Sequence, residues 1–380
     1  MRIAVLGAGP AGLYLAYLIK RRHADADVRV VEQNRADATF GFGVVFSDRA
    51  LEFLRDNDPD TAAAIAPHLE TWDDITLDHG GERIAIDGIG FAAIGRLRLL
   101  ALLQARARSV GVEPMYERAI ARLDELGDAD LVVGADGVNS LVRRAHAQAF
   151  GSTTTHLSNR FAWFGTAKPF PTLTQTFRES SEHGHFNAHH YRYAPDKSTF
   201  IIEVDEETFH RAGFHRMAHS KARAICEHVF ADTLEGRPLI SNNSVWRQFP
   251  IVRNERCWHG RHVLIGDALH TAHFSIGSGT RLAMEDAIAL DAALARHPSA
   301  LQDAFEDYEA TRRPVIAKLV AAADASGKWY QDFARHMQLA PTDFAMSYLQ
   351  RTGRVDIERL RRGSPRFAAR YERAHSLTKG

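Results

Sequence analysis

The sequence predicts an α/β fold in which a Rossmann-like domain is interleaved with a β-sheet domain and followed by a helical C-terminal tail. Three observations predict it. The chain opens on a strand, a glycine turn, a helix and a strand. Residues 155–205 change to alternating, aromatic-rich runs typical of antiparallel strands, and a second glycine-rich segment follows at 266–279. Because the glycine-rich segments flank the β-rich part, we expect interleaved domains rather than domains in series.

The opening elements form a βαβ unit. Residues 2–6 (RIAVL) predict a strand, residues 11–22 have helical spacing, and residues 28–32 (VRVVE) predict a second strand that ends in an acid. Further helices are expected at 48–57, 96–110, 280–294 and over 300–380, with mostly helix at 206–234. Further strands are expected at 75–79, 83–87, 130–135, 161–166, 173–178, 185–193, 199–204 and 262–265.

The turn after the first strand carries the pattern GxGxxG at Gly7, Gly9 and Gly12. The first glycine makes the tight turn, the second lets the backbone approach a pyrophosphate, and the third lets helix and strand pack closely. Free N–H groups at the start of the helix favour phosphate. A carboxylate at Glu32 can accept hydrogen bonds from ribose hydroxyls and disfavours a 2′-phosphate. The pattern predicts a dinucleotide site for FAD or NAD rather than NADP.

Composition excludes several classes of partner. Lys plus Arg and Asp plus Glu both number 47, which argues against nucleic acid or an anionic membrane surface. The two cysteines, Cys226 and Cys257, form no CxxC pair, so neither a disulfide framework nor a metal site is expected. No apolar stretch is long enough to span a bilayer, and the chain begins at once with a strand rather than a signal peptide. We therefore expect a cytoplasmic protein.

Two further motifs decide between the dinucleotides. Residues 134–143 (GADGVNSLVR), with Asp136 and Gly137, resemble the second nucleotide signature of the single-component flavin hydroxylases, the p-hydroxybenzoate hydroxylase type, and Gly266-Asp267 resembles the third. The resemblance implies FAD, with Asp267 on the ribitol hydroxyls, Arg96 near the pyrophosphate, and the turn after Asp267 facing the flavin ring. The full set of expected FAD-binding residues is Gly7, Gly9, Pro10, Ala11, Gly12, Glu32, Gln33, Val44, Val45, Arg96, Asp136, Gly137, Gly266, Asp267, Gly277, Ser278, Gly279 and Thr280.

This resemblance covers nearly the whole chain and implies the domain boundaries. The FAD-binding domain is expected over 1–150, with a small hairpin insertion near 70–95, and again over 251–300. The β-rich substrate domain is expected over 151–250 and the helical C-terminal region over 301–380.

A narrower resemblance lies in the third motif, which reads GDALHTAHFSIGSGTRLAMEDAIAL, with Phe274-Ser275 in place of the usual proline. Together with FGFGVVFS at 40–47 and the runs FAWFGT, AHHYRY and STFIIEVDEETF, it is similar to salicylyl-CoA 5-hydroxylase, to the monooxygenase half of 2-aminobenzoyl-CoA monooxygenase/reductase and to the indole hydroxylase of violacein biosynthesis. The chain ends at 380, without the second flavin domain of the 2-aminobenzoyl-CoA enzyme. Salicylyl-CoA is therefore the substrate expected first, with gentisyl-CoA as product.

The resemblance also implies the reaction of an NAD(P)H-dependent flavoprotein monooxygenase. NADH would reduce FAD transiently, and O2 would give a C4a-hydroperoxyflavin that attacks the ring para to a hydroxyl or amino group. The chain has no second GxGxxG, which fits a nicotinamide that visits the flavin without a domain of its own; NADPH is less favoured. A CoA thioester would also need an arginine or histidine patch at the pocket mouth for its phosphates.

The residues that touch the substrate are less sharply indicated. The catalytic candidates are His270, His273, Phe274, His190 and Tyr191, and the substrate-binding candidates are Phe46 and Arg192. His270 and His273 lie in the turn expected to face the flavin, so one of them is expected to border the reacting ring. In the strand 185–193, His190 and Arg192 share one face and His189 and Tyr191 the other, and the sequence leaves open which face meets the flavin cavity.

Four alternatives are considered, and two of them stay open. The chain lacks the Trp-x-Trp-x-Ile-Pro run of a flavin halogenase, and a geranylgeranyl-reductase-like flavoprotein would not explain GDALHTAHFSIGSGT. The second hypothesis is a hydroxylase of an indole or another free aromatic acid in secondary metabolism. A non-catalytic flavin-binding protein is the alternative of a different class. The sequence allows a monomer or a homodimer.

Overall fold

A five-stranded sheet, parallel except for one edge strand, forms the core of the first domain in the computed structural model, which describes residues 1–47 and 51–376. Its order is β16-β17-β8-β1-β2, and β1, β2, β8 and β17 run parallel. The strands are β1 (Arg2–Leu6), β2 (Asp27–Val31), β8 (Leu131–Gly134), β16 (Trp258–His259) and β17 (His262–Leu264). Segments more than 200 residues apart thus share one sheet, and the prediction of interleaved domains is confirmed.

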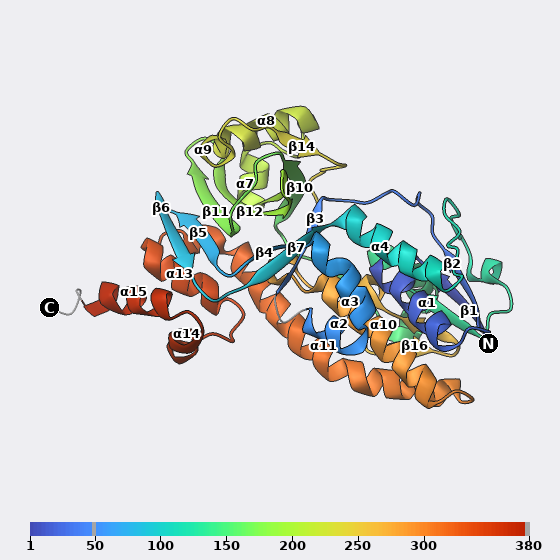
Figure 1. Ribbon diagram of the computed structural model, residues 1–380. Coiled ribbons are helices and arrows are strands. Elements are labelled where there is room, and N and C mark those ends of the chain that lie inside the picture. Colours follow the sequence, from blue (N-terminus) through green and yellow to red (C-terminus); the bar gives the residue numbers. More distant parts are fainter. Residues whose placement is uncertain (48–50, 377–380) are drawn as a thin grey trace.

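Helices pack on this sheet in the lower right of Figure 1. α1 (Pro10–Arg22) contacts both α10 (Gly279–Arg296) and α4 (Arg96–Ser109), and the long α11 (Leu301–Gln331) runs along α10. Shorter helices are α2 (Glu52–Asn57), α3 (Pro59–Ile65), α5 (Leu141–Ala145) and α6 (Ala147–Phe150). Of the helix predicted at 48–57, residues 48–50 lie outside the described residues, and the rest contains α2.

A second sheet of seven strands has the order β14-β10-β13-β12-β11-β5-β6. Its strands are β5 (Ile75–His79), β6 (Glu82–Ile86), β10 (Arg160–Thr166), β11 (Leu173–Ser180), β12 (Gly184–Ala194), β13 (Lys197–Val204) and β14 (Leu239–Ser241). The four aromatic-rich strands predicted in the middle of the chain are confirmed. The hairpin β5–β6 was predicted as an insertion in the nucleotide domain. In the structure β5 pairs parallel with β11, so the hairpin extends the seven-stranded sheet instead. A two-stranded hairpin is marginal alone and gains stability from such pairing.

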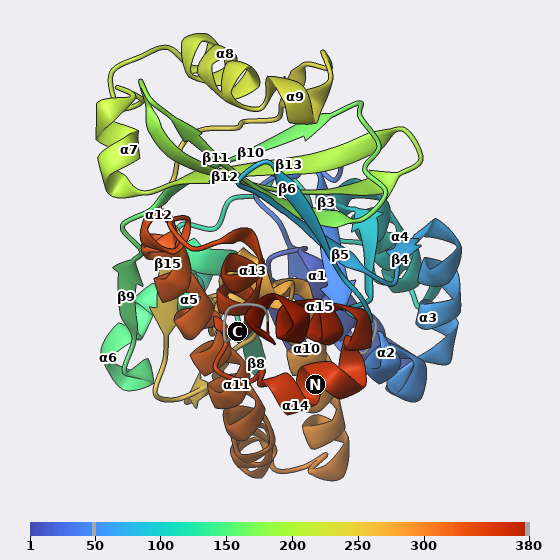
Figure 2. The same cartoon turned by 90° about the vertical axis from the view of Figure 1, so that its left-hand side faces the viewer.

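The two faces of the seven-stranded sheet are covered differently (Figure 2). α7 (Glu206–Arg211), α8 (His219–Val229) and α9 (Ala231–Leu234) pack on the outer face, around Phe186, Phe200 and Phe230. The inner face meets the end of α11, α12 (Phe333–His336) and α13 (Pro341–Gln350), around Phe177 and Phe344. The chain then ends in α14 (Ile357–Gly363) and α15 (Pro365–Ser376).

Two small sheets connect the large ones. β3 (Gly43–Ser47), β7 (Phe91–Gly95) and β4 (Glu70–Trp72) form one, and β9 (Thr153–His156) pairs with β15 (Pro250–Arg253) in the other. β3 and β7 lie between the nucleotide domain and the inner face of the seven-stranded sheet (Figure 1). Among the described residues, no helix combines the length and the apolar character needed to cross a membrane.

Candidate active site

The glycine turn after β1 has the geometry that its pattern predicts. Gly7 has φ +107°, and a Cβ there would lie 2.3 Å from the carbonyl oxygen of Ala135; a Cβ at Gly12 would lie 2.0 Å from the carbonyl oxygen of Gly7. Both glycines are therefore required by close backbone packing. A Cβ at Gly9 would meet no atom within 4 Å, so the space beside the start of α1 is open at this position.

Glu32 and the N-terminus of α1 flank that open space. Glu32 Oε2 accepts a hydrogen bond from the backbone N–H of Ala8 at 3.0 Å, and Oε1 accepts one from the N–H of Asn34 at 2.9 Å. These bonds fix the carboxylate beside the turn and leave acceptor capacity for ribose hydroxyls. α1 begins at Pro10 with no side-chain cap, which leaves its first N–H groups for a phosphate.

All three nucleotide motifs follow the carboxyl ends of adjacent parallel strands: Gly7 follows β1, Asp136 follows β8 and Asp267 follows β17. Ligands of open α/β sheets bind at this edge. Asp136 Oδ2 accepts from the N–H of Leu141 at 2.6 Å, while its buried Oδ1 has no partner in the described chain. The side chain of Asp267 is exposed and lies within electrostatic range of the Arg96 guanidinium. This donor and acceptor set fits the pyrophosphate and polyol of FAD.

The remaining predicted FAD residues lie in or beside these turns. Gly277 has φ +60°, and its Cβ would lie 3.1 Å from Val45 Cγ1, so the third turn packs closely against β3, which carries Val44 and Val45. Gly137 opens the short turn after Asp136, and Gly279 starts α10, with Ser278 before it and Thr280 in its first turn. Arg96 starts α4, and its Nε donates to Thr39 Oγ1 at 3.1 Å. The binding roles of these residues stay predictions.

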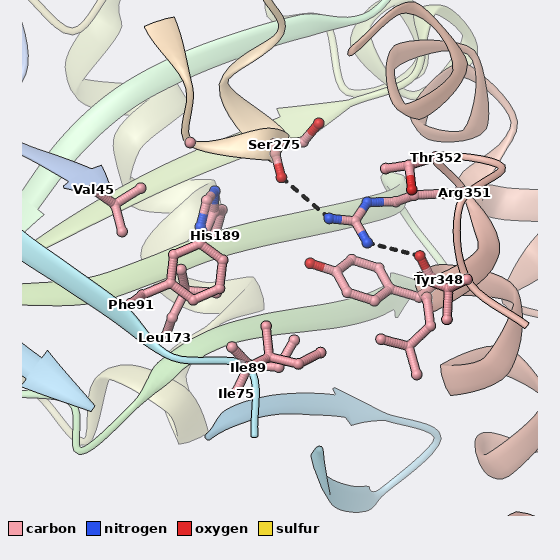
Figure 3. A pocket seen from close by; sticks show the side chains of 13 residues that line it. Val45, Ile75, Ile89, Phe91, Leu173, His189, Ser275, Tyr348, Arg351 and Thr352 are labelled. Atoms are coloured by element: carbon pink, nitrogen blue, oxygen red, sulfur yellow. Dashed lines mark hydrogen bonds between the residues drawn. The ribbon is translucent and has the colours of Figure 1, made fainter. Parts of the chain in front are cut away.

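An apolar cavity lies where the third turn meets the inner face of the seven-stranded sheet (Figure 3). Its volume is about 140 Å³, close to the roughly 150 Å³ of a protein cavity that accommodates one benzene ring. Val45 on β3, Phe91 on β7 and Leu173 on β11 form apolar walls. The other residues that line it are Ile75, Ile89, His189, Ser275, Gly277, Tyr348, Leu349, Arg351, Thr352 and Val355.

His189 and Arg351 are the basic groups of the cavity wall. Both ring nitrogens of His189 are buried without a partner in the described chain, and burial lowers the pKa of this imidazole to about 3. His189 is therefore neutral at physiological pH and can donate or accept one hydrogen bond. Arg351 Nη2 donates to the carbonyl oxygen of Ser275 at 3.2 Å, and its guanidinium lies 3.7 Å from the centroid of the Tyr348 ring (Figure 3).

The structure shows which face of β12 meets the cavity. His190 points to the outer face, where its Nε2 lies 2.9 Å from Thr176 Oγ1 and its ring stacks on Phe200. Arg192 is paired with Glu70, at 2.6 Å between Nε and Oε2. Tyr191 shares the inner face with His189, but its hydroxyl donates to the carbonyl oxygen of Gly43 at 3.0 Å and so joins β12 to β3.

The other substrate candidates do not line the cavity. His270 is bonded to Asp286 behind the third turn, and Phe46 is only 2% exposed within the core of the nucleotide domain. His273 Nδ1 lies 2.8 Å from Ser275 Oγ, one step behind the cavity wall. Phe274 packs against Phe161, with 5.1 Å between ring centroids. Direct substrate contact by these four residues stays a prediction.

Sequence reasoning missed His189, Ser275 and Arg351 as cavity residues. His189 was placed on its strand, but period-two alternation alone could not say which face is buried against the flavin domain. Ser275 lies inside the third motif, but its neighbours His273 and Phe274 were named as catalytic candidates. Arg351 follows α13 in the tail and belongs to no motif, so the sequence carries no signal for it.

Comparison with known proteins also indicates a FAD-binding protein. The family model described as "FAD binding domain" matches residues 111–323, more than half of the chain. The chain belongs to this family of FAD-binding monooxygenases. It is a FAD-dependent flavoprotein that hydroxylates aromatic rings, and the alternative of a non-catalytic flavin-binding protein is set aside because the relatives are named as hydroxylases or monooxygenases.

Three relatives show the range of the family. Salicyloyl-CoA 5-hydroxylase of a Streptomyces species is 42% identical over 93% of this chain and 70% of that protein. The 3-hydroxy-4-methyl-anthranilyl-[aryl-carrier protein] 5-monooxygenase of Streptosporangium sibiricum is 37% identical over 87% of this chain and 89% of its own length. Protodeoxyviolaceinate monooxygenase of Chromobacterium violaceum is 32% identical over 92% of this chain and 94% of its own length.

A solved structure has the same fold. P. aeruginosa PqsL in complex with 2-aminobenzoylacetate superposes with a TM-score of 0.69 at 22% identity, and the match covers 92% of this chain and 99% of PqsL. The predicted α/β fold class and the resemblance to the flavin hydroxylases are confirmed.

Proposed function

We propose that the chain hydroxylates the ring of an aryl-CoA thioester, with salicylyl-CoA (salicyloyl-CoA) as substrate and gentisyl-CoA as product, at the expense of NADH and O2. The observation that carries this proposal is the apolar cavity between the third nucleotide turn and the seven-stranded sheet, which contains His189 and Arg351. The 42% identity to salicyloyl-CoA 5-hydroxylase supports the choice of thioester.

The residues of the cavity have separable roles in this proposal. Phe91, Leu173 and Val45 hold the ring by apolar contact and exclude water from the reacting atoms. Neutral His189 bonds the ring substituent, and Arg351 bonds the thioester carbonyl oxygen. When bound, FAD supplies the electron transfer and oxygen activation. The protein thus binds and orients the substrate, while the cofactor carries the redox chemistry.

The mouth of the cavity suits the long anionic tail of a thioester. Arg351, Thr352 and Val355 line the cavity in the loop after α13, and Arg354 lies in the same loop. A guanidinium there can pair with the CoA phosphates. We propose NADH rather than NADPH as the reductant and the cytoplasm as the place of action; the protein acts as a monomer or homodimer.

NADH oxidation by the purified FAD-loaded protein tests this function. The rate should rise when salicylyl-CoA is added and respond less to free salicylate. If no aryl substrate tested changes the rate of NADH oxidation, the protein is not a hydroxylase whose flavin reduction depends on bound substrate. A second candidate, a hydroxylase of a free indolic acid, is supported by the 32% identity to protodeoxyviolaceinate monooxygenase, and stimulation by indolic acids alone would favour it.

A further inference from the structure

The C-terminal tail carries an excess of positive charge, although the chain as a whole is balanced at 47 basic and 47 acidic residues. Residues 351–376 contain eight arginines and three acidic side chains. The arginines are Arg351, Arg354, Arg359, Arg361, Arg362, Arg366, Arg370 and Arg373, and the acids are Asp356, Glu358 and Glu372. Positive charge gathered in one region of a neutral protein attracts anionic ligands to that region.

Three of these arginines have a structural use. Among the described residues, Arg361 pairs with Glu358 and Glu372, Arg366 with Asp74 and Asp87, and Arg370 with Glu82. Glu82 lies on β6, and Asp74 and Asp87 lie just outside the β5–β6 hairpin. Arg366 and Arg370 therefore fasten α15 to this hairpin, and their charge is neutralised there.

Arg354 and Arg359 have no carboxylate partner in the part of the chain that the structure describes. Arg354 Nη2 donates to the backbone carbonyl oxygen of Lys318 on α11, and Arg359 Nη1 donates to that of Arg354 at 3.1 Å. Each guanidinium is thus held through one nitrogen and keeps its other N–H donors for a ligand. The acid of this loop, Asp356, is engaged as the N-cap of α14, where it accepts from the N–H of Arg359 at 2.7 Å. With the exposed Lys318, three cations gather where the loop after α13 meets α11.

This group of cations lies close to the cavity but outside it. Thr352 and Val355, on either side of Arg354 in the chain, line the cavity and are partly exposed, and Thr352 lies beside Arg351 at one edge of it (Figure 3). Ser326 on α11 marks the level of the cavity, because its Oγ accepts from Arg351 Nε at 3.1 Å. Lys318 precedes Ser326 on the same helix by roughly 12 Å of helical rise. A ligand that fills both places therefore needs a linker between its ring and its anionic end.

The face of α11 between Lys318 and the cavity is small and uncharged. The residues three and seven positions after Lys318, which share its face, are Ala321 and Ala325, and they are exposed and partly exposed. The acid of this part of the helix, Asp324, pairs with Arg253 instead. An uncharged flexible chain can lie along these methyl groups without removing a charge from water. The pantetheine arm that joins the thioester to the phosphates of CoA is such a chain.

We propose that Lys318, Arg354 and Arg359 bind the 3′-phospho-ADP group of the thioester substrate and so select a CoA thioester over a free aromatic acid. The proposal rests on the proposed function, because it needs an aryl-CoA ring in the cavity. The ring lies in the cavity, the pantetheine arm runs along α11, and the phosphates meet the three cations. Guanidinium groups suit this role because their planar donors match phosphate oxygens in pairs. The nucleotide is bound only through charge and hydrogen bonds, and no covalent bond changes at this site.

The test compares two substrates that differ only in the nucleotide. Salicylyl-CoA carries the 3′-phospho-ADP group, whereas salicylyl-pantetheine ends before the first phosphate. Product formation by the FAD-loaded enzyme with NADH gives kcat and KM for each thioester. Arg354→Met, Arg359→Met and Lys318→Met each remove one cation of the site, alone and combined in a triple variant. Arg216→Met removes an exposed arginine between α7 and α8, beyond the outer face of the seven-stranded sheet, and is the matched control.

The wild type should show a KM for salicylyl-CoA about tenfold or more below its KM for salicylyl-pantetheine. Each single variant should raise the KM for salicylyl-CoA roughly fivefold, and the triple variant should remove the difference between the two thioesters. The KM for salicylyl-pantetheine should stay the same in every variant, which also shows that the ring site is intact and the protein folded. Arg216→Met should match the wild type with both substrates. If one single variant does not retain FAD, the other two decide.

Three results would overturn the nucleotide site and leave the proposed hydroxylation of an aryl thioester standing. The first is an equal KM of the wild type for the two thioesters. The second is a preference for salicylyl-CoA that persists in variants that retain FAD. The third is a lower KM for a salicylyl-loaded carrier protein than for salicylyl-CoA, lost in the same variants, which would assign the cations to a protein partner. Failure of the wild type to hydroxylate either thioester would instead overturn the proposed function, and the nucleotide site with it.

Discussion

His270 and Asp286 meet in a buried hydrogen bond, with 2.9 Å between Nε2 and Oδ2. Asp286 also accepts from the N–H of Gly266 at 2.9 Å and from Arg312 Nε at 2.8 Å. This network ties the third nucleotide turn to α10 and α11. Burial alone would raise the pKa of the Asp286 carboxyl, but His270 and Arg312 hold it below its usual value. His270 thus supports the turn from behind instead of lining the cavity.

Replacement of Asp286 by alanine should therefore destabilise the fold. It removes the partner of the buried Arg312, and loss of one member of a buried ion pair costs about 3–5 kcal/mol of unfolding free energy. Because the folded-state pKa of Asp286 is depressed, the stabilisation is present at neutral pH and is lost as the pH falls through that lowered pKa. Urea unfolding measured from neutral to acidic pH checks both points, with Asp332→Ala, at an exposed side chain, as control. Equal unfolding free energies for Asp286→Ala and wild type would contradict the role of this network.

The glycine turn offers a matched pair of substitutions. Gly12→Ala should lower the thermal midpoint, because its Cβ would lie 2.0 Å from a backbone oxygen. Gly9→Ala should fold normally, because its Cβ meets no atom of the chain within 4 Å, yet it should weaken FAD retention by crowding the pyrophosphate. Thermal unfolding and flavin absorbance after gel filtration separate the two effects. Normal FAD content in Gly9→Ala would show that the dinucleotide does not approach this position.

The adjacent histidines of β12 provide a second pair. His189→Ala should lower kcat/KM by roughly tenfold through loss of one hydrogen bond to the substrate, and should reduce the product formed per NADH. Since His189 stays neutral above about pH 3, its loss should not move the pH profile. His190→Ala, on the outer face, should lower the thermal midpoint and leave the ratio of product to NADH unchanged. The reverse pattern would place the substrate on the other face of the sheet.

Arg351 connects the tail to the cavity. Arg351→Met keeps much of the side-chain length but loses the guanidinium, and we expect KM for the thioester to rise about tenfold with a smaller change in kcat. Arg335→Met, at an exposed arginine of α12, serves as control. Steady-state kinetics with salicylyl-CoA measure both parameters. An unchanged KM would remove Arg351 from substrate binding.

Local sequence patterns predicted much of the fold because they encode local geometry. The turn Gly7–Gly12 and the acid Glu32 have the spacing of a nucleotide site at a sheet edge, whereas Asp136 and Asp267 were indicated by the resemblance to the flavin hydroxylases. The structure places the turns that carry these residues at that edge. The alternating strands 173–178 and 185–193 were also predictable, because alternation is intrinsic to a strand.

The positions of the residues that line the cavity depend on long-range packing, which no local sequence pattern encodes. The inward face of β12 is decided by α13 and β3, which lie far from it in sequence, and so His189 rather than His190 lines the cavity. The pairing of β5 with β11 depends on a parallel register between distant segments. Arg351 reaches the cavity only because α11 and α13 return the tail to the sheet.

The proposed function requires that one oxygen atom of O2 enters the ring of an aryl-CoA thioester. The most direct measurement is mass spectrometry of the product made from salicylyl-CoA and NADH under isotopically labelled dioxygen. We expect gentisyl-CoA that carries a single labelled oxygen on the ring. NADH oxidation with salicylyl-CoA that yields only hydrogen peroxide, or a product without label, would contradict it.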